Sequence, residues 1–286
     1  MSKTIRLLMP QWQGGVNPNY TLGAELLAWL APDNDDQPLI RVPVHAHDGT
    51  TLEKENGIPG RKHLMDQLKS AELIINAHKP DRIIMFGGDC LVEQAPFAYL
   101  NERYGGELAL LYIDAHSDLV APNGYDNAHA IVLGNLIGEG HPDFAQEVKI
   151  PINPNKIFLA GLGATSDQEN ELIERLGIRA AGTKELDKST DSIKEWIKEN
   201  NIKHLAIHLD LDVLDPKAFR SLLFANPEAK EPIDFPMGEM LFPQLINIIK
   251  EISGETEVVG LGVTEHLPWD SINLKNLLSE IPILNQ

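Results

Sequence analysis

The sequence predicts an α/β protein in which helices pack on both faces of a mostly parallel sheet. Two observations support this fold class. Short apolar runs that are typical of strands alternate with longer segments of helical periodicity, in the order β-α-β-α. The run Leu108–Ile113 is continuously hydrophobic, as expected for a strand buried on both faces of a parallel sheet. Because the composition does not change along the chain, we expect one doubly wound domain over residues 1–286.

The first part of the chain predicts strands and helices in alternation. The strands are expected at Ile5–Met9, Leu39–Val44, Arg82–Phe86 and Leu108–Ile113. The helices are expected at Thr21–Leu30, Gly60–His78 and Val92–Tyr104. Apolar residues recur at helical spacing in the first two helices, and a proline that cannot continue the helix follows each of them. The strand at Arg82–Phe86 leads directly into Gly87-Gly88-Asp89-Cys90, which predicts a tight turn at the strand end.

The second part continues the same pattern. Strands are expected at Lys156–Ala160, around Ile178, at His204–Leu211 and at Glu257–Val263. Helices are expected at Asp167–Leu176, Asp191–Glu199 and Glu239–Ile252. The longest irregular stretch, Pro216–Met237, contains four prolines. A loop of this length in a compact domain is usually functional, so we expect it to border the active site.

Composition and charge exclude several classes of function. The formal net charge of −18 argues against nucleic acid or an anionic membrane surface as a partner, because binding to phosphates needs an excess of Lys and Arg. A single cysteine excludes an intramolecular disulfide and favours a reducing compartment. No signal peptide and no apolar run of membrane-spanning length are visible. We therefore expect a cytoplasmic protein that acts on a small molecule.

Two predicted strands end in side chains that can bind metals. Asp114, His116 and Asp118 follow the strand at Leu108–Ile113, and the alternation of a strand places His208, Asp210 and Asp212 on one face. Such groups are costly to bury as bare charges unless a metal or a partner compensates them. Carboxylates with one or two imidazoles suit a divalent cation such as Mn²⁺. The cluster offers more ligands than one metal ion can bind. The alternative is that these acids cap the following helices. Capping would explain Asp118 or Asp215 taken singly, but not the whole set.

These residues resemble the signature motifs of the arginase/agmatinase/formimidoylglutamase (ureohydrolase) superfamily. The matching motifs are Asp114-Ala115-His116-Ser117-Asp118 and Asp210-Leu211-Asp212-Val213-Leu214-Asp215-Pro216, with Gly87-Gly88-Asp89 upstream and Glu265 downstream. Their order and spacing match from about residue 80 to 266. The resemblance implies a three-layer α/β/α fold with a mostly parallel sheet of about eight strands. It also implies a dinuclear manganese site that hydrolyses a guanidino or formimino group with a metal-activated hydroxide.

The resemblance further implies a role for each matching residue. Asp114 and Asp210 would bridge the two metals, His116 and Asp212 would complete one metal, and Asp118 would serve the other. His129 would be the proton shuttle that protonates the leaving amine. Asp118 would also orient the hydroxide. Glu265 would receive the guanidinium of the substrate, since a carboxylate accepts paired N–H donors.

At one ligand position the chain departs from the family pattern. Cys90 stands where the family usually has a histidine, after Gly87-Gly88-Asp89. Thiolate is a soft ligand that suits Zn²⁺ better than Mn²⁺. Three outcomes are open: the site is weak or empty, it holds a softer metal, or a water replaces the missing imidazole. The first would leave a catalytically degenerate protein that binds a small ligand or a partner, which is the alternative to an active hydrolase.

The substrate is less closely defined. Arginases carry an Arg and two acids in a block that matches residues 161–167 here, and Gly161-Leu162-Gly163-Ala164-Thr165-Ser166-Asp167 lacks that arginine and both expected acids. This argues against arginine and leaves other guanidino or formimino compounds. A single-zinc deacetylase of related fold is less compatible, because it lacks the second Asp-x-Asp pair. The family is commonly trimeric or hexameric. The roles of His45, His47, His208 and His266 stay open.

Overall fold

A computed structural model describes residues 2–121, 125–229 and 235–284 of the chain. Its centre is an eight-stranded sheet with the order β2-β1-β5-β10-β9-β6-β7-β8, in which all neighbouring strands are parallel. A separate antiparallel hairpin consists of β3 (Lys54–Glu55) and β4 (Ile58–Pro59). This confirms the predicted class of fold.

The sheet strands and the helices alternate along the chain. The sheet strands are β1 (Thr4–Met9), β2 (Leu39–Arg41), β5 (Arg82–Gly87), β6 (Leu108–Ile113), β7 (Ile157–Ala160), β8 (Arg179–Ala181), β9 (His204–Asp210) and β10 (Glu257–Thr264). The helices are α1 (Tyr20–Leu30), α2 (Arg61–His78), α3 (Gln94–Arg103), α4 (Val132–Ile137), α5 (Pro142–Ala145), α6 (Asp167–Leu176), α7 (Thr183–Leu186), α8 (Asp191–Glu199), α9 (Phe242–Ser253) and α10 (Trp269–Ser279).

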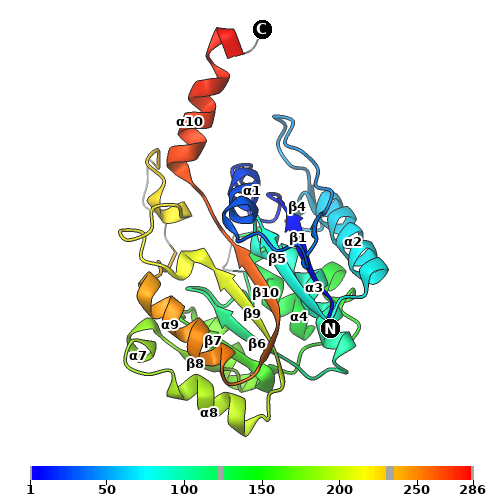
Figure 1. The fold of residues 1–286 in the computed structure, drawn as a ribbon, viewed down its shortest axis with the longest axis vertical. Coiled ribbons are helices and arrows are strands. Elements are labelled where there is room, and N and C mark those ends of the chain that lie inside the picture. Colours follow the sequence, from blue (N-terminus) through cyan, green and yellow to red (C-terminus); the bar gives the residue numbers. More distant parts are fainter. Residues whose placement is uncertain (1, 122–124, 230–234, 285–286) are drawn as a thin grey trace.

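The sheet lies between two layers of helices, with α2, α3 and α4 on one side and α8 and α9 on the other (Figure 1). All six residues of β6 are buried, so this strand contributes to both hydrophobic layers. Leu108, Leu110 and Tyr112 pack in the layer of α2, α3 and α4. Ala109, Leu111 and Ile113 pack in the layer of α8 and α9. Burial on both faces explains why the sequence of this strand is continuously apolar rather than alternating.

Most predicted elements are present with shifts of a few residues. The predicted helices at 167–176 and 191–199 have the observed bounds. The predicted strand at 39–44 is only β2, at the sheet edge, and the predicted helix at 92–104 begins with a 3-10 turn at Cys90–Glu93. The hairpin and the helices α4, α5, α7 and α10 were not predicted. Part of the irregular stretch at 216–237 lies outside the described residues, at 230–234.

The sheet order brings the carboxyl ends of four neighbouring strands together. β5, β10, β9 and β6 are adjacent in the sheet although β5 and β10 are far apart in the sequence. Since all four are parallel, the residues after each strand lie at one edge. In open α/β sheets this edge is where ligands bind. Cys90, Glu265, Asp210 and Asp114 lie at the ends of these four strands, in that order across the sheet.

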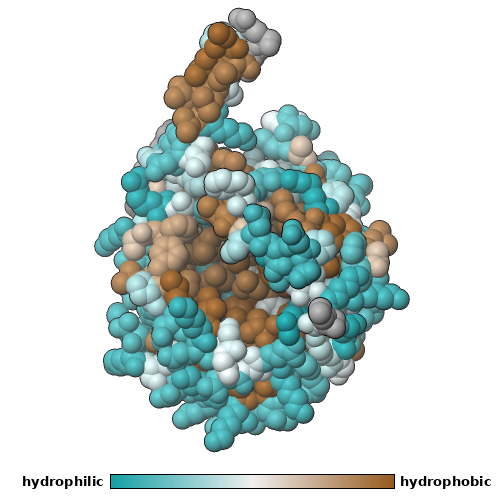
Figure 2. Space-filling view, viewed as in Figure 1, coloured by the Kyte–Doolittle hydropathy of each residue, from teal (hydrophilic) through white to brown (hydrophobic). Residues whose placement is uncertain are grey.

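Helix α10 extends away from the rest of the protein (Figure 1). The face of α10 that is visible in Figure 2 is largely apolar. Leu274, Leu277 and Leu278 are exposed on this helix, and Ile283 and Leu284 follow in the same exposed segment. Among the described residues, no helix has the length and apolar character needed to cross a membrane.

Candidate metal centre and active site

Two site residues have a backbone conformation that is uncommon for side chains with a Cβ atom. Asp118 has φ 48° and Glu265 has φ 63°, both in the left-handed region. Neither conformation is favoured for a residue other than glycine, and such residues are concentrated at functional sites. Both are held by the surrounding structure: the backbone N–H of Glu265 donates to the carbonyl of Gly88, and the carbonyl of Asp118 accepts from the N–H of Gly134.

The first group of possible metal ligands consists of Asp114, His116 and Asp212, whose ligand atoms all lie within 4.8 Å of one another. The Nδ1 atom of His116 lies 3.4 Å from Oδ1 of Asp114 and 3.2 Å from Oδ2 of Asp212. Local hydrogen bonds fix these carboxylates, since the N–H of His116 donates to Oδ1 of Asp114 at 2.8 Å. The N–H of Asp212 likewise donates to Oδ1 of Asp210 at 2.6 Å.

The second group of possible metal ligands combines two sets of residues that have His208 in common, and it shares Asp114 with the first group. Asp114, Asp118 and His208 form one set of mutually close ligand atoms, and Cys90, His208 and Asp210 form another. Several buried atoms of the two groups have no hydrogen-bond partner among the described residues: Asp114 Oδ2, His116 Nε2, His208 Nε2 and Asp212 Oδ1. Buried polar atoms are rarely left unpaired, and oxygen and nitrogen atoms that converge in this way fit divalent cations.

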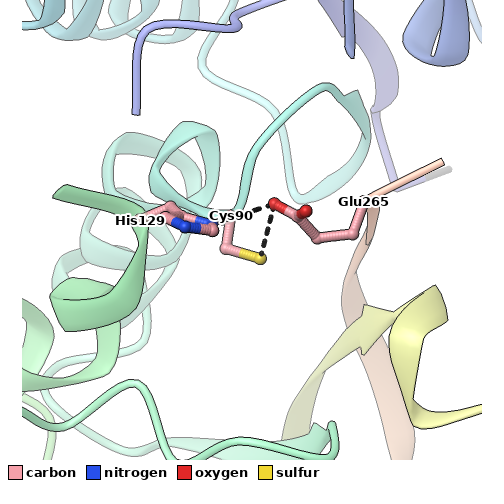
Figure 3. Close-up of side chains that lie close together, drawn as sticks. All are labelled: Cys90, His129 and Glu265. Atoms are coloured by element: carbon pink, nitrogen blue, oxygen red, sulfur yellow. Dashed lines mark hydrogen bonds and ion pairs between the residues drawn. The ribbon is translucent and has the colours of Figure 1, made fainter. Parts of the chain in front are cut away.

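Cys90 lies among oxygen atoms rather than in an apolar pocket. Its Sγ atom lies 3.1 Å from Oδ2 of Asp210, 3.3 Å from Oγ1 of Thr264 and 3.6 Å from Oε1 of Glu265. In Figure 3 the carboxylate of Glu265 is directed toward both the sulfur of Cys90 and the ring of His129. Burial, together with the negative charges of Asp210 and Glu265, raises the pKa of the thiol well above its usual value. The neutral thiol is a hydrogen-bond donor here, whereas the thiolate is the form that binds metals.

The carboxylates of the site repel one another. Burial and the neighbouring charge of Asp114 raise the pKa of Asp118 to about 7. Burial, with the charges of Asp212 and Asp114, raises the pKa of Asp210 well above its usual value. Burial opposes the ionised form of Asp114 too, but the neighbouring rings of His116 and His208 outweigh it and hold the pKa of Asp114 below its usual value. A concentration of negative charge in a buried place is what bound cations would relieve.

His129 is connected to Glu265 on one side and to Tyr125 on the other. Its Nδ1 atom lies 3.0 Å from Oε1 of Glu265, and its Nε2 atom lies 2.8 Å from the hydroxyl of Tyr125. Burial opposes protonation of the ring, but Tyr125 and Glu265 outweigh it and raise the pKa of His129 well above its usual value. The imidazole can therefore carry a proton near neutral pH, as a general acid must.

A cavity of about 90 Å³ joins these groups. Cys90, His116, Asp118, His129 and Glu265 line its polar part. Tyr125, Leu223, Phe224, Phe235 and Pro236 form an apolar wall, and four of these five come from the irregular stretch at 216–237. The described part of this stretch thus borders the cavity as predicted. The cavity volume is well above the roughly 10–15 Å³ that one water molecule needs on the same measure, so the cavity has room for a small planar group.

The structure brings together every residue that the sequence singled out for the site: Cys90, Asp114, His116, Asp118, His129, Asp210, Asp212 and Glu265. His45 and His47 belong to none of the metal-competent groups found in the described part of the chain. His266 contacts the backbone of α1 instead, with its Nδ1 atom 3.1 Å from the carbonyl oxygen of Gly23.

Three contributors were missed by the sequence prediction. Glu93 lies against His208, Tyr125 against His129, and the hydroxyl of Tyr112 donates to Oδ2 of Asp118 at 2.6 Å. Alternation along the strand placed His208 on the same face as Asp210, and no other feature of the sequence indicated that His208 lies in the site. Nothing in the local sequence indicates Glu93 or the two tyrosines.

The fold and the site together define a class of protein: an α/β/α protein of the ureohydrolase superfamily with groups of side chains that could hold a metal at the carboxyl edge of its sheet. The family model for the "Arginase family" matches residues 42–272. The chain therefore belongs to the arginase family.

Known relatives are similar in fold but distant in sequence. A mitochondrial arginase of Medicago truncatula is 20% identical over 208 residues, which are 72% of this chain and 54% of that protein. The chain thus matches about half the length of this relative. The structure of Entamoeba histolytica arginase in complex with L-ornithine has a TM-score of 0.78 at 16% identity, covering 98% of this chain and 99% of that one. Formimidoylglutamase of Bacillus subtilis has a TM-score of 0.68 at 14% identity, covering 94% and 80%.

Proposed function

We propose that the protein hydrolyses a C–N bond of a linear amidine, a guanidino or formimino compound, with two bound divalent cations. The observation that carries this proposal is that two groups of metal-competent side chains share Asp114 and open into the cavity that also holds His129 and Glu265. Membership of the arginase family, which supports a hydrolase, is consistent with it.

Asp114 and Asp210 would be ligands of both cations. His116 and Asp212 would complete one of them, and Asp118, with the Cys90 position, would serve the other. The unpartnered oxygen and nitrogen atoms of Asp114, His116 and Asp212 support this assignment. Carboxylate-rich sets favour Mn²⁺, and a site that includes the Cys90 thiolate would favour Zn²⁺. Bound cations of this kind lower the pKa of a water molecule so that it is a nucleophile near neutral pH.

The remaining residues would bind and orient the reactants. Glu265 would accept two N–H donors of the planar substrate cation, and its anionic surroundings would favour a positive charge. Asp118 would accept a hydrogen bond from the attacking water and fix its direction. His129 would donate its proton to the nitrogen that leaves when the C–N bond breaks, after which Tyr125 and Glu265 favour its reprotonation.

The residues around the cavity favour a substrate other than arginine. Arginine has a carboxylate and an ammonium group in addition to its guanidinium, and each needs a polar partner. The segment Gly161–Asp167 has no cationic side chain, and Thr165 and Ala164 are its members in the cavity wall. The apolar part of the cavity lining includes Phe224 and Phe235. We expect a guanidino or formimino group on a partly apolar carrier.

A substrate panel tests the proposed function. The purified protein would be incubated with Mn²⁺, Co²⁺ or Zn²⁺ and with agmatine, guanidino acids, formiminoglutamate and arginine, and release of urea, formamide or ammonia would be measured. We expect turnover of at least one substrate other than arginine, lost in Asp114→Asn. No turnover with any combination of metal and substrate would overturn the proposal.

A second candidate function is supported by Cys90. Its thiol occupies a ligand position and donates to Asp210, so one cation site could be lost while the cavity persists. The protein would then bind a small cationic ligand or a partner without hydrolysing it. Metal analysis separates the two: two metal equivalents per chain support the hydrolase, and none in excess Mn²⁺ supports the binding protein.

We also propose that the chain forms a homo-oligomer in the cytoplasm. The exposed leucines of α10 support association, because a projecting apolar helix loses unfavourable contact with water when another copy covers it. Light scattering would show a trimer or hexamer if this is correct and a monomer if it is not. The buried free thiol of Cys90, the only cysteine, is compatible with a reducing compartment.

A further inference from the structure

We propose that His208 supplies the nitrogen ligand of the second cation, in place of the side chain at position 90. This inference rests on the proposed function, because it concerns the same pair of cations. It assigns the ligand to a residue of β9, whereas Cys90 lies in the 3-10 turn after β5. It also explains how a chain without a histidine at position 90 can still hold two metals.

His208 lies at the centre of the second group. It is the one residue present both in the set with Asp114 and Asp118 and in the set with Cys90 and Asp210. Its Nε2 atom lies 3.6 Å from Oδ2 of Asp114. Two ligands that each bind a metal at about 2.0–2.2 Å are at most about 4.4 Å apart, so this separation allows a shared ion.

Neither the Nε2 atom of His208 nor the Oδ2 atom of Asp114 is engaged in a hydrogen bond among the described residues. The side chain of His208 is fully buried, and its Nε2 atom has no hydrogen-bond partner among the described residues. The same holds for Oδ2 of Asp114. An imidazole nitrogen and a carboxylate oxygen that face each other at 3.6 Å in a buried place, neither of them in a hydrogen bond within the described chain, can bind one cation between them.

The opposite nitrogen of the ring is held by a carboxylate. The Nδ1 atom of His208 lies 2.6 Å from Oε2 of Glu93, which is also buried. Histidines that bind metals usually donate their other N–H to a carboxylate, which fixes the tautomer and raises the basicity of the ligand nitrogen. Glu93 thus directs Nε2 of His208 toward Asp114.

Residues of the neighbouring strands β10 and β6 pack against Glu93 and His208. A Cβ atom at Gly262 in β10 would lie 1.8 Å from Oε1 of Glu93, so only glycine leaves room for the carboxylate. The ring of His208 stacks on Tyr112 of β6, with ring centres 3.8 Å apart and planes 17° apart. The hydroxyl of Tyr112 in turn donates to Asp118. One set of contacts therefore orients His208 and Asp118 together.

Metal content measures the role of His208 directly. Each variant would be dialysed against Mn²⁺ and, separately, Zn²⁺, and the metal per chain and the affinity of each equivalent would be determined. We expect two equivalents in the native protein, one in His208→Ala, and two again in the double variant Cys90→His/His208→Ala, in which the turn after β5 supplies an imidazole. Cys90→Ala should keep two equivalents.

The control is His204, on the same strand. Its ring also stacks on a tyrosine, Tyr104, and its Nδ1 atom lies near a carboxylate, Glu257, but it belongs to none of the metal-competent groups in the described chain. His204→Ala should bind two equivalents. If His208→Ala does not fold, Glu93→Gln decides: we expect the affinity for the second metal to fall about 10- to 100-fold.

Three results would overturn the inference. These are two equivalents of unchanged affinity in His208→Ala, unchanged affinity in Glu93→Gln, or loss of the second equivalent in Cys90→Ala. With Co²⁺, a thiolate charge-transfer band in the native protein would also assign the ligand to Cys90. If the native protein binds no metal at all, the proposed function itself fails, so the two failures are distinguishable.

Discussion

The Nδ1 atom of His129 lies 3.0 Å from Oε1 of Glu265, although 136 residues separate them in the chain. His129 comes from a turn after β6, and Glu265 from the end of β10. This contact links the proposed proton donor to the proposed receptor of the substrate cation. It also means that each side chain can be changed to test the role of the other.

Glu265→Gln should bind substrate poorly while metal binding is retained. The variant removes a buried negative charge opposite the substrate cation, and loss of one partner of such a pair costs about 2 to 5 kcal/mol. We expect kcat/KM to fall at least about 30-fold, since each 1.4 kcal/mol corresponds to a factor of about ten. Steady-state kinetics and elemental analysis measure the two effects.

Glu169→Gln is the matched control for this change. Glu169 lines the same cavity, but Ser117 and Ser166 donate to its carboxylate, and glutamine can fill the same helix-capping role. We expect a small effect on kcat/KM. An equal loss in both variants would contradict the specific role of Glu265.

His129→Asn should remove the proton donor and leave the metals in place. General acid catalysis by a positioned side chain contributes about 10²- to 10⁴-fold, so we expect kcat to fall within this range with two metals still bound. Tyr125→Phe removes only the hydroxyl that contacts His129 and should have a smaller effect. A kcat of His129→Asn within twofold of the native value would exclude the assignment.

His266 should make the folded state sensitive to acid. Burial lowers the pKa of His266, although the carbonyl of Gly23 favours the protonated form. Below the unfolded pKa of about 6.5, the unfolded chain takes up a proton that the folded protein does not bind. The free energy of unfolding should therefore fall as the pH drops from 6.5 toward the folded pKa, by at most about 1.4 kcal/mol per pH unit from this group.

Urea unfolding of the native protein and of His266→Gln between pH 7.5 and 5.5 measures this contribution. The glutamine cannot titrate, so its unfolding free energy should depend less steeply on pH. Parallel pH profiles for the two proteins would show that His266 does not contribute.

The sequence predicted the sheet, and the edge at which the candidate site lies, well because both depend on local patterns. A strand buried on both faces must be apolar throughout, as Leu108–Ile113 is, and polar residues directly after it mark the edge. Alternation along the predicted strand placed His208, Asp210 and Asp212 on one face. His208 and Asp210 do lie in β9, but the strand ends at Asp210, and Asp212 belongs to the 3-10 turn Leu211–Val213 that follows. The organisation as one domain over residues 1–286 stays a prediction.

Other features depend on contacts that no local pattern records. Glu93 and His208 meet across 115 positions of the chain, and their pairing requires the space at Gly262. Asp118 and Glu265 adopt left-handed backbone conformations without a glycine to indicate them. Helix α10 was missed because its leucines do not form one buried face: all three are exposed.

Metal stoichiometry tests the central claim most directly. The purified protein would be stripped with a chelator, dialysed against Mn²⁺ or Zn²⁺, and analysed for metal per chain, beside Asp114→Asn as the variant that removes the shared ligand. We predict two equivalents in the native protein and at most one in Asp114→Asn. No bound metal in the native protein, with either cation in excess, would contradict the account.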